Sequence, residues 1–250
     1  MTPQTSSRRL DWNDARLTDP HGQPDKAARV RAMFDEIAPT YERVNRVLSM
    51  GRDASWRRRV VQWAGVRPDD RVLDLACGTG DLARAIAAAR PRFVTGCDFA
   101  ERMLALASSR GGDRLNWCRG DALKLPFADG SFSIVSCAFG VRNWQNLSVG
   151  VAEVSRVLCC GGRFVILEFS MPRAPLLGAM YRAYFRHVLP RLATWISRDR
   201  CGAYRYLPAS VATFVDSTGM RDTLMRSGFD RVGEKSMTGG IVTAYLAWKT

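Results

Sequence analysis

The sequence predicts an α/β fold in which a doubly wound, mostly parallel sheet carries helices on both faces. Through the middle of the chain, short apolar runs typical of buried strands alternate with segments of helical spacing. A glycine-containing turn also joins the first of these strands to a helix, where sheets of this kind bind nucleotides. The 250 residues suffice for one domain with a full core, and nothing marks a second domain boundary.

The segments before the sheet divide into a tail and a helical region. Residues 1–26 mix Ser, Thr, Asp, Pro and Arg without an apolar period, which predicts a flexible tail without a function of its own. From residue 27 to residue 63 the apolar positions recur at helical spacing, interrupted by Pro39 and Gly51. These residues are expected to form roof helices over the pocket of a single domain that spans residues 27–250.

Seven strands are expected. Five lie in a core that spans residues 64–170, at 71–75, 93–97, 115–119, 132–137 and 163–168. The last segment, 211–250, is expected to hold a helix and a hairpin whose strands, 231–235 and 241–248, join across Gly239 and Gly240. Because ligands of such sheets bind at the carboxyl ends of the strands, the residues that follow each strand are the candidate site.

Residues 171–210 are expected to form an inserted lid. Within it, residues 175–196 carry a broad apolar face, and four arginines line the other side: Arg182, Arg186, Arg191 and Arg198. Two interpretations stay open. The segment is either an ordinary amphipathic helix pair packed on the sheet, or a lid that admits an apolar substrate from a membrane whose phosphates the arginines meet.

The glycine turn and the next two strand ends predict a nucleoside site. Gly78 and Gly80 lack side chains, so the main chain can lie against a ligand near the following helix. Asp98 ends the second strand, where an acid can accept hydrogen bonds from ribose hydroxyls. Asp121 and Ala122 follow the third strand and are expected near the base edge.

Two acids of the turn favour S-adenosyl-L-methionine as the co-substrate. Asp74 lies within the turn and Asp81 follows it. Carboxylates repel the pyrophosphate of a dinucleotide but suit the ammonium of a methionine-like group. In the competing interpretation, the glycines serve only the turn and Asp81 only caps the helix.

The charge balance calls for an anionic partner. The chain has 37 Lys and Arg against 24 Asp and Glu, a net charge of +13. A nucleic acid and an acidic membrane surface both suit this charge, which does not choose between them. The sequence leaves the oligomeric state open, a homo-oligomer included.

Composition also limits the compartment and the chemistry. No run of about 18 apolar residues and no secretory leader is seen, so a cytoplasmic protein is expected, with contact at the inner face of the membrane as an option. The 7 cysteines include no C-x-x-C pair, and their odd number argues against disulfides. With only His21 and His187 available, no metal site is expected.

A set of longer motifs resembles the quinone-biosynthesis C-methyltransferases, the family of demethylmenaquinone and polyprenyl-benzoquinol methyltransferases. The resemblance covers nearly everything after the tail, and it implies a class I S-adenosylmethionine-dependent methyltransferase fold. The motifs are F-D-E-I-A-P-T-Y (34–41) with Asn45, L-D-L-A-C-G-T-G-D (73–81), G-D-A-L-K-L-P-F (120–127), F-G-V-R-N (139–143), R-V-L (156–158) with G-G-R (161–163), L-E-F-S (167–170) and Y-L-P-A-S-V (206–211).

The resemblance implies methyl transfer from S-adenosyl-L-methionine to a ring carbon of a prenylated quinol. Demethylmenaquinol is the first expectation, and a 2-polyprenyl-6-methoxy-benzoquinol, or both, is the alternative. By the same resemblance Thr79, Asp98, Asp121 and Ala122 contact the cofactor. Two positions depart from the family pattern: Ala76 stands where the turn usually has its first glycine, and Ala138 where the family often has serine.

The chemistry of ring methylation assigns the expected catalytic residues. The ring must be reduced and partly ionised, so the protein must stabilise a phenolate. Arg142 suits this as a fixed cation, although it stays protonated and is a poor base. Asn143 is expected to orient the ring oxygen or a water, and Tyr41 to be a third contact. The competing interpretations are a surface or capping Arg142, a core-packing Tyr41 and a structural Glu168.

Rival functions lack their motifs. An amino-directed nucleic-acid methyltransferase usually carries [N/D]-P-P-[Y/F] after the fourth strand, where this chain reads C-A-F-G (137–140). No Pro-Cys pair for pyrimidine chemistry occurs. A dehydrogenase would need the glycine that holds a pyrophosphate. RNA methylation therefore stays a remote alternative, and no nucleic-acid partner is expected.

Overall fold

The structure, a computed structural model, describes residues 10–172, 174–189, 191 and 201–250. Its seven-stranded sheet has the order β3-β2-β1-β4-β5-β7-β6, with β1 to β5 parallel and β7 antiparallel to both of its neighbours. The predicted doubly wound, mostly parallel sheet is confirmed. The strands are β1 (Arg71–Leu75), β2 (Phe93–Asp98), β3 (Leu115–Arg119), β4 (Phe132–Ala138), β5 (Leu158–Phe169), β6 (Arg231–Met237) and β7 (Val242–Trp248).

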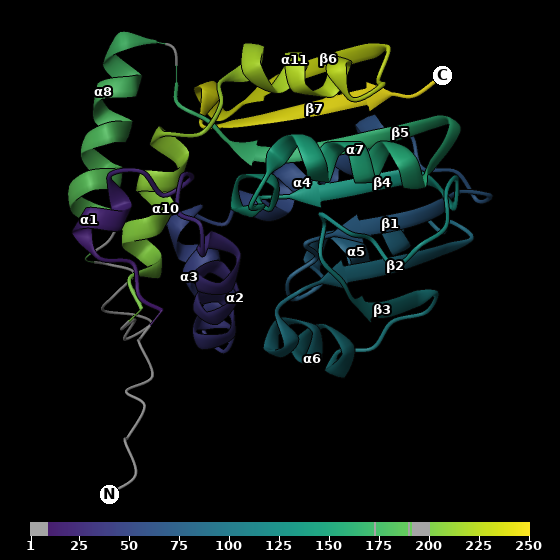
Figure 1. The fold of residues 1–250 in the computed structure, drawn as a ribbon, viewed down its shortest axis with the longest axis horizontal. Helices are drawn as coiled ribbons and strands as arrows, with labels where there is room; N and C mark the ends of the chain where they lie inside the picture. Colours follow the sequence, from purple (N-terminus) through teal and green to yellow (C-terminus); the bar gives the residue numbers. More distant parts are fainter. Residues whose placement is uncertain (1–9, 173, 190, 192–200) are drawn as a thin grey trace, which may run out of the picture.

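Helices cover both faces of the sheet. The helices α7 (Leu147–Val157) and α11 (Ser217–Arg226) lie on one face, whereas α4 (Asp53–Ala64) and α5 (Asp81–Ala87) lie behind it in Figure 1. Side chains of β5 alternate between the two cores: Phe164 packs with the first pair of helices and Val165 with the second. The helix α6 (Glu101–Ser109) packs along β2 and β3.

A third core lies beyond the carboxyl ends of the parallel strands. Here α2 (Lys26–Ile37), α3 (Tyr41–Leu48), α8 (Pro175–Ala183) and α10 (Ala203–Ala212) gather at one end of the sheet (Figure 1). The helices expected over residues 27–63 are α2, α3 and α4, and Pro39 and Gly51 lie between them. α2 and α3 lie at the end of the sheet, whereas α4 packs on its face. No helix of the described residues has the length and hydropathy that crossing a bilayer requires.

The lid is only partly covered by the structure. α8 continues into a π-helical turn (Tyr184–Val188), so the described part of the expected apolar segment is helical. Leu192, Trp195, Ile196 and Arg198 lie outside the described residues, as do the side chains of Leu177 and Arg186. Of the four arginines expected along this segment, Arg182 and Arg191 have described side chains, and both are exposed.

The expected flexible tail is wrong for residues 10–26. Trp12 is 2% exposed, and its ring stacks on Tyr206 of α10 with ring centroids 4.3 Å apart. The short helix α1 (Asp14–Leu17) follows, and the Trp12 backbone N–H donates to the Cys201 carbonyl at 2.9 Å. The error has a physical cause: a single aromatic anchor buried by a distant helix leaves no periodic pattern in its own segment. Residues 1–9 lie outside the described residues.

Candidate active site

The turn after β1 has the backbone that its glycines predict. Gly78 and Gly80 have φ angles of +55° and +86°, and a Cβ on Gly80 would lie 2.4 Å from the Trp117 ring. Gly80 therefore shapes the turn through its missing side chain. Ala76, which stands where the family turn usually has its first glycine, adopts a φ of +53°. This angle is strained for a residue with a Cβ.

A pocket at the carboxyl ends of the strands, here called the nucleoside pocket, brings together residues from three strand ends. Gly78, Asp98, Asp121 and Ala122 all line it, as expected for a nucleoside. Its apolar walls come from Phe34, Phe99, Met103, Leu123 and Phe139.

Asp98 is the buried acid of the nucleoside pocket. Its Oδ2 accepts the Gly78 N–H at 2.8 Å, and its Oδ1 accepts the Ala100 N–H at 2.8 Å. Burial raises the pKa of Asp98 to about 6, against these hydrogen bonds. The carboxyl thus joins the glycine turn to the start of α6, and each oxygen keeps a further lone pair for a ribose hydroxyl.

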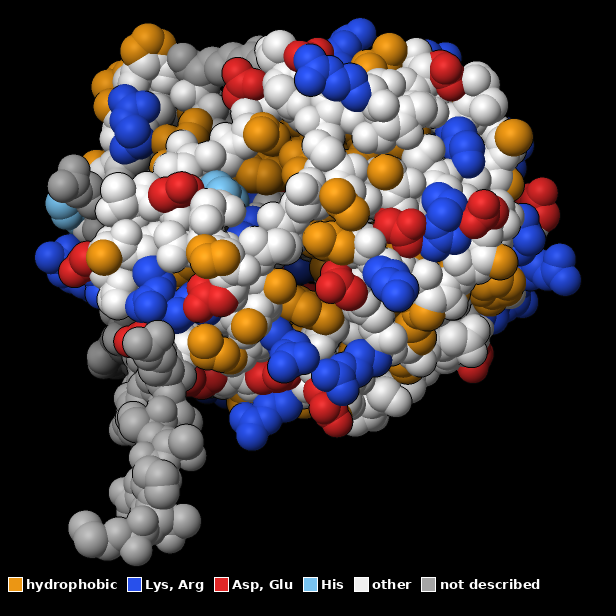
Figure 2. Space-filling view, in the orientation of Figure 1, with side chains coloured by type: hydrophobic (Ala, Val, Ile, Leu, Met, Phe, Trp, Pro, Cys, Tyr) orange, Lys and Arg blue, Asp and Glu red, His pale blue; other side chains and the backbone are white. Residues whose placement is uncertain are grey.

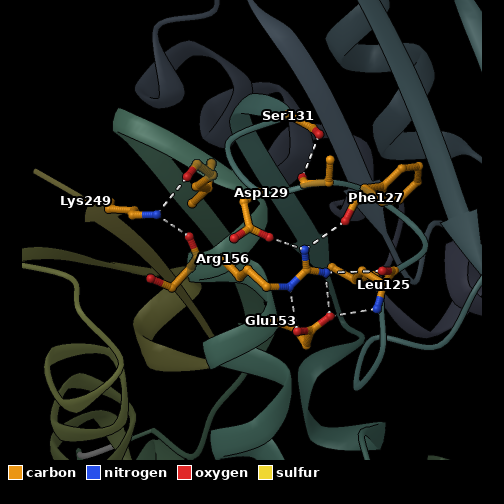
Figure 3. A network of polar contacts seen from close by, with 10 residues as sticks. Leu125, Phe127, Asp129, Ser131, Glu153, Arg156 and Lys249 are labelled. Atoms are coloured by element: carbon orange, nitrogen blue, oxygen red, sulfur yellow. Dashed lines mark hydrogen bonds and ion pairs between the residues drawn. The ribbon is translucent and has the colours of Figure 1, made fainter.

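The segment that carries Asp121 and Ala122 is held from outside by Arg156 of α7 (Figure 3). Arg156 pairs with Glu153 at 2.8 Å and donates to the Leu125 carbonyl at 3.2 Å. Glu153 in turn accepts the Leu125 N–H at 2.8 Å. This network fixes the loop between β3 and β4. Asp121 itself is exposed, whereas Ala122 is buried.

A smaller pocket adjoins the nucleoside pocket on the other side of Gly78. We call it the acidic pocket; it is lined by Tyr41, Arg57, Asp74, Ala76, Cys77, Gly78, Thr79, Asp81, Leu82 and Ala138. Asp74 lies in β1 and not, as expected, within the turn, because it pairs with the neighbouring strands. It is 1% exposed; its Oδ1 accepts the Ser136 hydroxyl at 2.7 Å, and its Oδ2 has no hydrogen-bond partner among the described residues. Burial raises the pKa of Asp74 to about 7.

A larger apolar cavity of about 370 Å³ lies beneath the roof helices. Its walls combine Met33, Phe34, Ile37 and Leu48 of the roof, Trp56 of α4, Phe169 of β5, and Tyr181, Tyr184 and Phe185 of the lid. Tyr41 lines this cavity and also both of the other pockets, so it stands at their junction. Burial raises the pKa of the Tyr41 hydroxyl, which keeps it neutral.

Arg142 is a buried charged residue in the wall of the apolar cavity. It is 5% exposed and pairs with Glu168, itself 2% exposed, with Nη1 and Oε1 2.7 Å apart. The same Nη1 donates to the Phe139 carbonyl at 2.7 Å, and Nε has no partner among the described residues. Arg142 is therefore no surface residue, and Glu168 positions it.

Phe139 shows strain at this point of the site. Its φ of +59° is a rare conformation for an aromatic residue. The conformation lets one carbonyl accept from Arg142 and, at 3.2 Å, from the Asn143 side chain. The Phe139 ring stacks on Phe169 with centroids 4.4 Å apart. The turn after β4 thus holds both expected catalytic residues.

Asn143 and Arg142 face different pockets. Asn143 lines the nucleoside pocket, and its Oδ1 accepts the Tyr206 hydroxyl at 3.1 Å. Arg142 lines the apolar cavity instead. The two neighbouring side chains therefore lie on opposite sides of the boundary between the nucleoside pocket and the apolar cavity, and Tyr41 lies at the same boundary.

Two contributors escaped the sequence reasoning. Arg57 of α4 is 8% exposed and pairs with Asp53, a pairing that the four-residue spacing on a helix could have indicated. The second is the first turn of α2. Lys26, 3% exposed, donates to the Trp144 carbonyl at 2.5 Å, and the Ala27 N–H donates to Gln145 at 2.8 Å. No local signal could have found these contacts, because they join residues more than 100 positions apart.

The fold and the site define a class I S-adenosylmethionine-dependent methyltransferase. An Aquifex aeolicus SAM-dependent methyltransferase superimposes with a TM-score of 0.58 at 15% identity, over 78% of this chain and 89% of that one. A Haemonchus contortus phosphoethanolamine N-methyltransferase, solved with S-adenosyl-L-methionine, gives 0.59 at 15% identity over 77% of this chain and 52% of its own. These similarities concern the fold.

The chain belongs to the ubiE/COQ5 methyltransferase family, whose pattern matches residues 23–249. A Deinococcus radiodurans demethylmenaquinone methyltransferase is 42% identical over 90% of this chain and 94% of its own. A Geotalea daltonii ubiquinone/menaquinone biosynthesis C-methyltransferase is 42% identical over 90% of this chain and 98% of its own. The predicted family and methyltransferase class are confirmed.

S-adenosyl-L-methionine, the cofactor of this class, fits the residues present. Asp74 lines a pocket that shares Tyr41 and Gly78 with the nucleoside pocket, and its Oδ2 has no partner among the described residues, so it can accept from an ammonium there. Asp98 would hold the ribose, and Asp121 and Ala122 would lie near the base. Thr79, 2% exposed, would lie along the amino-acid part.

Proposed function

We propose that the protein methylates a ring carbon of a prenylated quinol, with demethylmenaquinol as its substrate. One observation carries the proposal: an apolar cavity that has Arg142, held by the buried Glu168, in its wall meets the cofactor pockets at Tyr41. Such a cavity suits a flat aromatic ring with an apolar tail, while the ion pair suits the ring's oxygens. The names of the Deinococcus radiodurans and Thermus thermophilus relatives, both demethylmenaquinone methyltransferases, agree with this substrate.

In the proposed reaction, a ring carbon of the quinolate donates an electron pair to the methyl carbon. A carbon–carbon bond forms as the carbon–sulfur bond breaks, and the sulfonium becomes a neutral thioether. The methylated ring carbon then loses its hydrogen as a proton, the ring regains aromaticity, and a ring oxygen recovers a proton. The proton released overall is the one that the quinol loses to water when it ionises to the quinolate, so one proton is released for each quinol methylated. The cofactor supplies the electrophilic methyl group.

The residues of the chain stabilise the charge on the ring oxygen and position the reacting groups. Arg142 keeps its charge, so it stabilises the phenolate as a fixed cation. Its partnerless Nε–H is available to an oxygen, while Glu168 and the Phe139 carbonyl hold the guanidinium in place. Tyr41, neutral at the junction, can donate a hydrogen bond to the same ring. Asn143, on the nucleoside side, would position the cofactor or a water.

We further propose that the mouth of the cavity contacts an anionic membrane surface. Met50 and Met180 line the cavity and yet are 79% and 63% exposed, and Leu176, one turn from Met180, is 76% exposed. Arg182 and Arg191 of the same segment are exposed. Hydrophobic and basic side chains lie together at the surface over α8 (Figure 2). Apolar side chains among arginines suit lipid acyl chains beside phosphates.

A benzoquinol is the second candidate substrate. The Geotalea daltonii relative is named for both ubiquinone and menaquinone biosynthesis, at 42% identity. Apolar walls of aromatic and aliphatic residues do not select strongly between a two-ring and a one-ring quinol. The net charge of +13 suits an RNA substrate, but no sequence motif supports RNA methylation.

The test is methyl transfer from labelled S-adenosyl-L-methionine to three acceptors: a short-chain demethylmenaquinol, a demethylated benzoquinol and bulk RNA. We expect label in the naphthoquinol and none in RNA. Label in the benzoquinol alone would move the substrate to the second candidate. Label in RNA alone would overturn the proposal.

A further inference from the structure

Among the described residues that line the acidic pocket, Arg57 is the one with a positively charged side chain. It lies on α4, outside the sheet core, and its side chain is 10% exposed. The residue also lines the apolar cavity, so it stands in the wall between the two spaces. Nothing in the proposed chemistry at Arg142 uses this second arginine.

The hydrogen bonds of Arg57 leave donors for a ligand. Its Nη1 pairs with Asp53 Oδ2 at 2.6 Å, which fixes the orientation of the guanidinium. Its Nη2 forms a longer ion pair with Asp81 Oδ2, at 3.6 Å, which is beyond hydrogen-bond distance. The planar guanidinium carries five N–H donors, so those on Nη2 stay available to an acceptor in the pocket.

The same pocket also holds an acceptor that lacks a donor. Asp74 Oδ2 is buried without a partner among the described residues. A cation with spare donors and an anion with a spare acceptor, lining one small pocket, match a zwitterion. The amino-acid end of S-adenosyl-L-methionine is such a group, with one carboxylate and one ammonium.

We propose that Arg57 binds the carboxylate of the cofactor's methionyl group, opposite the ammonium that Asp74 receives. Arg57 is then a cofactor-binding residue contributed by α4, a helix that precedes the sheet in the chain. Because α4 also forms a wall of the apolar cavity, the cofactor's amino-acid end and the quinol space share one anchored side chain. The inference rests on the cofactor and not on the identity of the methyl acceptor. The assignment of Arg57 and the proposed quinol substrate can therefore fail separately.

The test is calorimetric binding of three ligands that differ at one end. S-adenosylhomocysteine carries both charged groups, its decarboxylated analogue keeps only the ammonium, and 5′-methylthioadenosine has neither. The variants are Arg57→Met and Arg57→Lys, with Arg58→Met, an exposed neighbour on the same helix, as the matched control. Binding of 5′-methylthioadenosine reports whether each variant keeps its nucleoside pocket.

We expect Arg57→Met to weaken S-adenosylhomocysteine about 10- to 100-fold, because charge-assisted hydrogen bonds are lost. Its affinity for the decarboxylated analogue should stay within about twofold of the wild type, and Arg57→Lys should lie between the two. For the wild type, the affinity for the decarboxylated analogue should be lower than that for S-adenosylhomocysteine by the same factor by which Arg57→Met weakens S-adenosylhomocysteine. Equal weakening of both ligands, or no weakening, would overturn the assignment; in the first case Arg57 would only support the fold of the pocket.

Discussion

At the scale of single residues, the site keeps acids in places where burial disfavours their charge. Asp74 and Asp98 are buried at the glycine turn, and burial raises the pKa of each. Neither group has an oppositely charged partner in direct contact among the ion pairs of the described residues. The folded protein therefore holds electrostatic free energy that a cationic ligand can release.

This predicts that Asp74→Asn stabilises the ligand-free protein at alkaline pH. The pKa of Asp74 lies near 7 in the folded state and near 3.8 when unfolded. Below the pKa of the unfolded state, Asp74 is protonated in both states and does not destabilise the fold. As the pH rises from there through the folded-state pKa near 7, the free energy of unfolding falls, because the unfolded state ionises more easily. The amide avoids that loss, so the variant should gain about 1–4 kcal/mol at pH 8.5 and less at pH 5.5.

Urea denaturation at the two pH values measures this difference. Asp113→Asn, at an exposed acid, is the control and should show no such dependence on pH. Cofactor binding by Asp74→Asn should weaken although the protein is more stable. A stability difference that is the same at both pH values would contradict the burial argument.

The Arg142–Glu168 pair predicts strong coupling between two buried charges. Arg142→Met or Glu168→Gln alone should cost about 3–5 kcal/mol, because each leaves an uncompensated or poorly bonded group. The double variant Arg142→Met/Glu168→Gln should cost clearly less than the sum of the two single variants. Denaturation of the four proteins gives the coupling free energy.

An exposed pair provides the comparison. Arg119 and Glu101 approach to 3.5 Å with side chains 55% and 76% exposed. Arg119→Met should therefore cost less than about 1 kcal/mol. Additive effects in the buried pair would show that Glu168 does not hold Arg142.

At the scale of elements, the sheet was predictable and its attachments were not. The predicted strand β1 agrees with the observed one at both ends, because a short apolar run between polar residues has clear limits. β5 begins at Leu158 and not at residue 163, since the two glycines at 161 and 162 obscured its first half. The helix α1 and its Trp12 anchor were missed, because their partner lies in α10.

The attachment predicts a large effect of Trp12→Ala. Trp12 stacks on Tyr206, and the Tyr206 hydroxyl donates to Asn143 in the nucleoside pocket. Removal of the ring should cost about 3–5 kcal/mol of stability. It should also weaken cofactor binding, because Tyr206 and then Asn143 gain freedom.

Thermal unfolding and calorimetric binding check both parts. Arg31→Ala, at an exposed position of α2, is the control and should change neither quantity much. Unchanged cofactor binding in a destabilised Trp12→Ala protein would mean that the segment serves stability alone.

At the scale of the whole molecule, segments distant in sequence build one connected site. The glycine turn, the strand ends and the F-G-V-R-N turn were visible as motifs, and the structure brings them to one end of the sheet. The apolar cavity was not predictable in its shape, because α2, α4, α8 and α10 each contribute one wall. Such long-range packing is decided by tertiary contacts that no local pattern records.

The exposed rim of the cavity predicts binding to anionic vesicles. Met50→Ser/Met180→Ser removes two exposed apolar side chains at the mouth and should weaken binding to phosphatidylglycerol-containing vesicles about tenfold or more. Met225→Ser, at a 43% exposed methionine of α11, is the matched control and should bind as the wild type does. Vesicle sedimentation at low and high salt measures both. Equal binding by all three proteins would move the membrane contact elsewhere or remove it.

The central claim is that an electron-rich ring, held by Arg142, takes the methyl group. We would measure transfer of labelled methyl to the same short-chain demethylated naphthoquinone in its reduced and in its oxidised form, with wild type, Arg142→Lys and the Arg119→Met control. We predict label only in the reduced form, a loss of about 100-fold or more in kcat for Arg142→Lys with unchanged cofactor affinity, and full activity in the control. Equal label in the oxidised quinone, or an unaffected Arg142→Lys protein, would contradict this account.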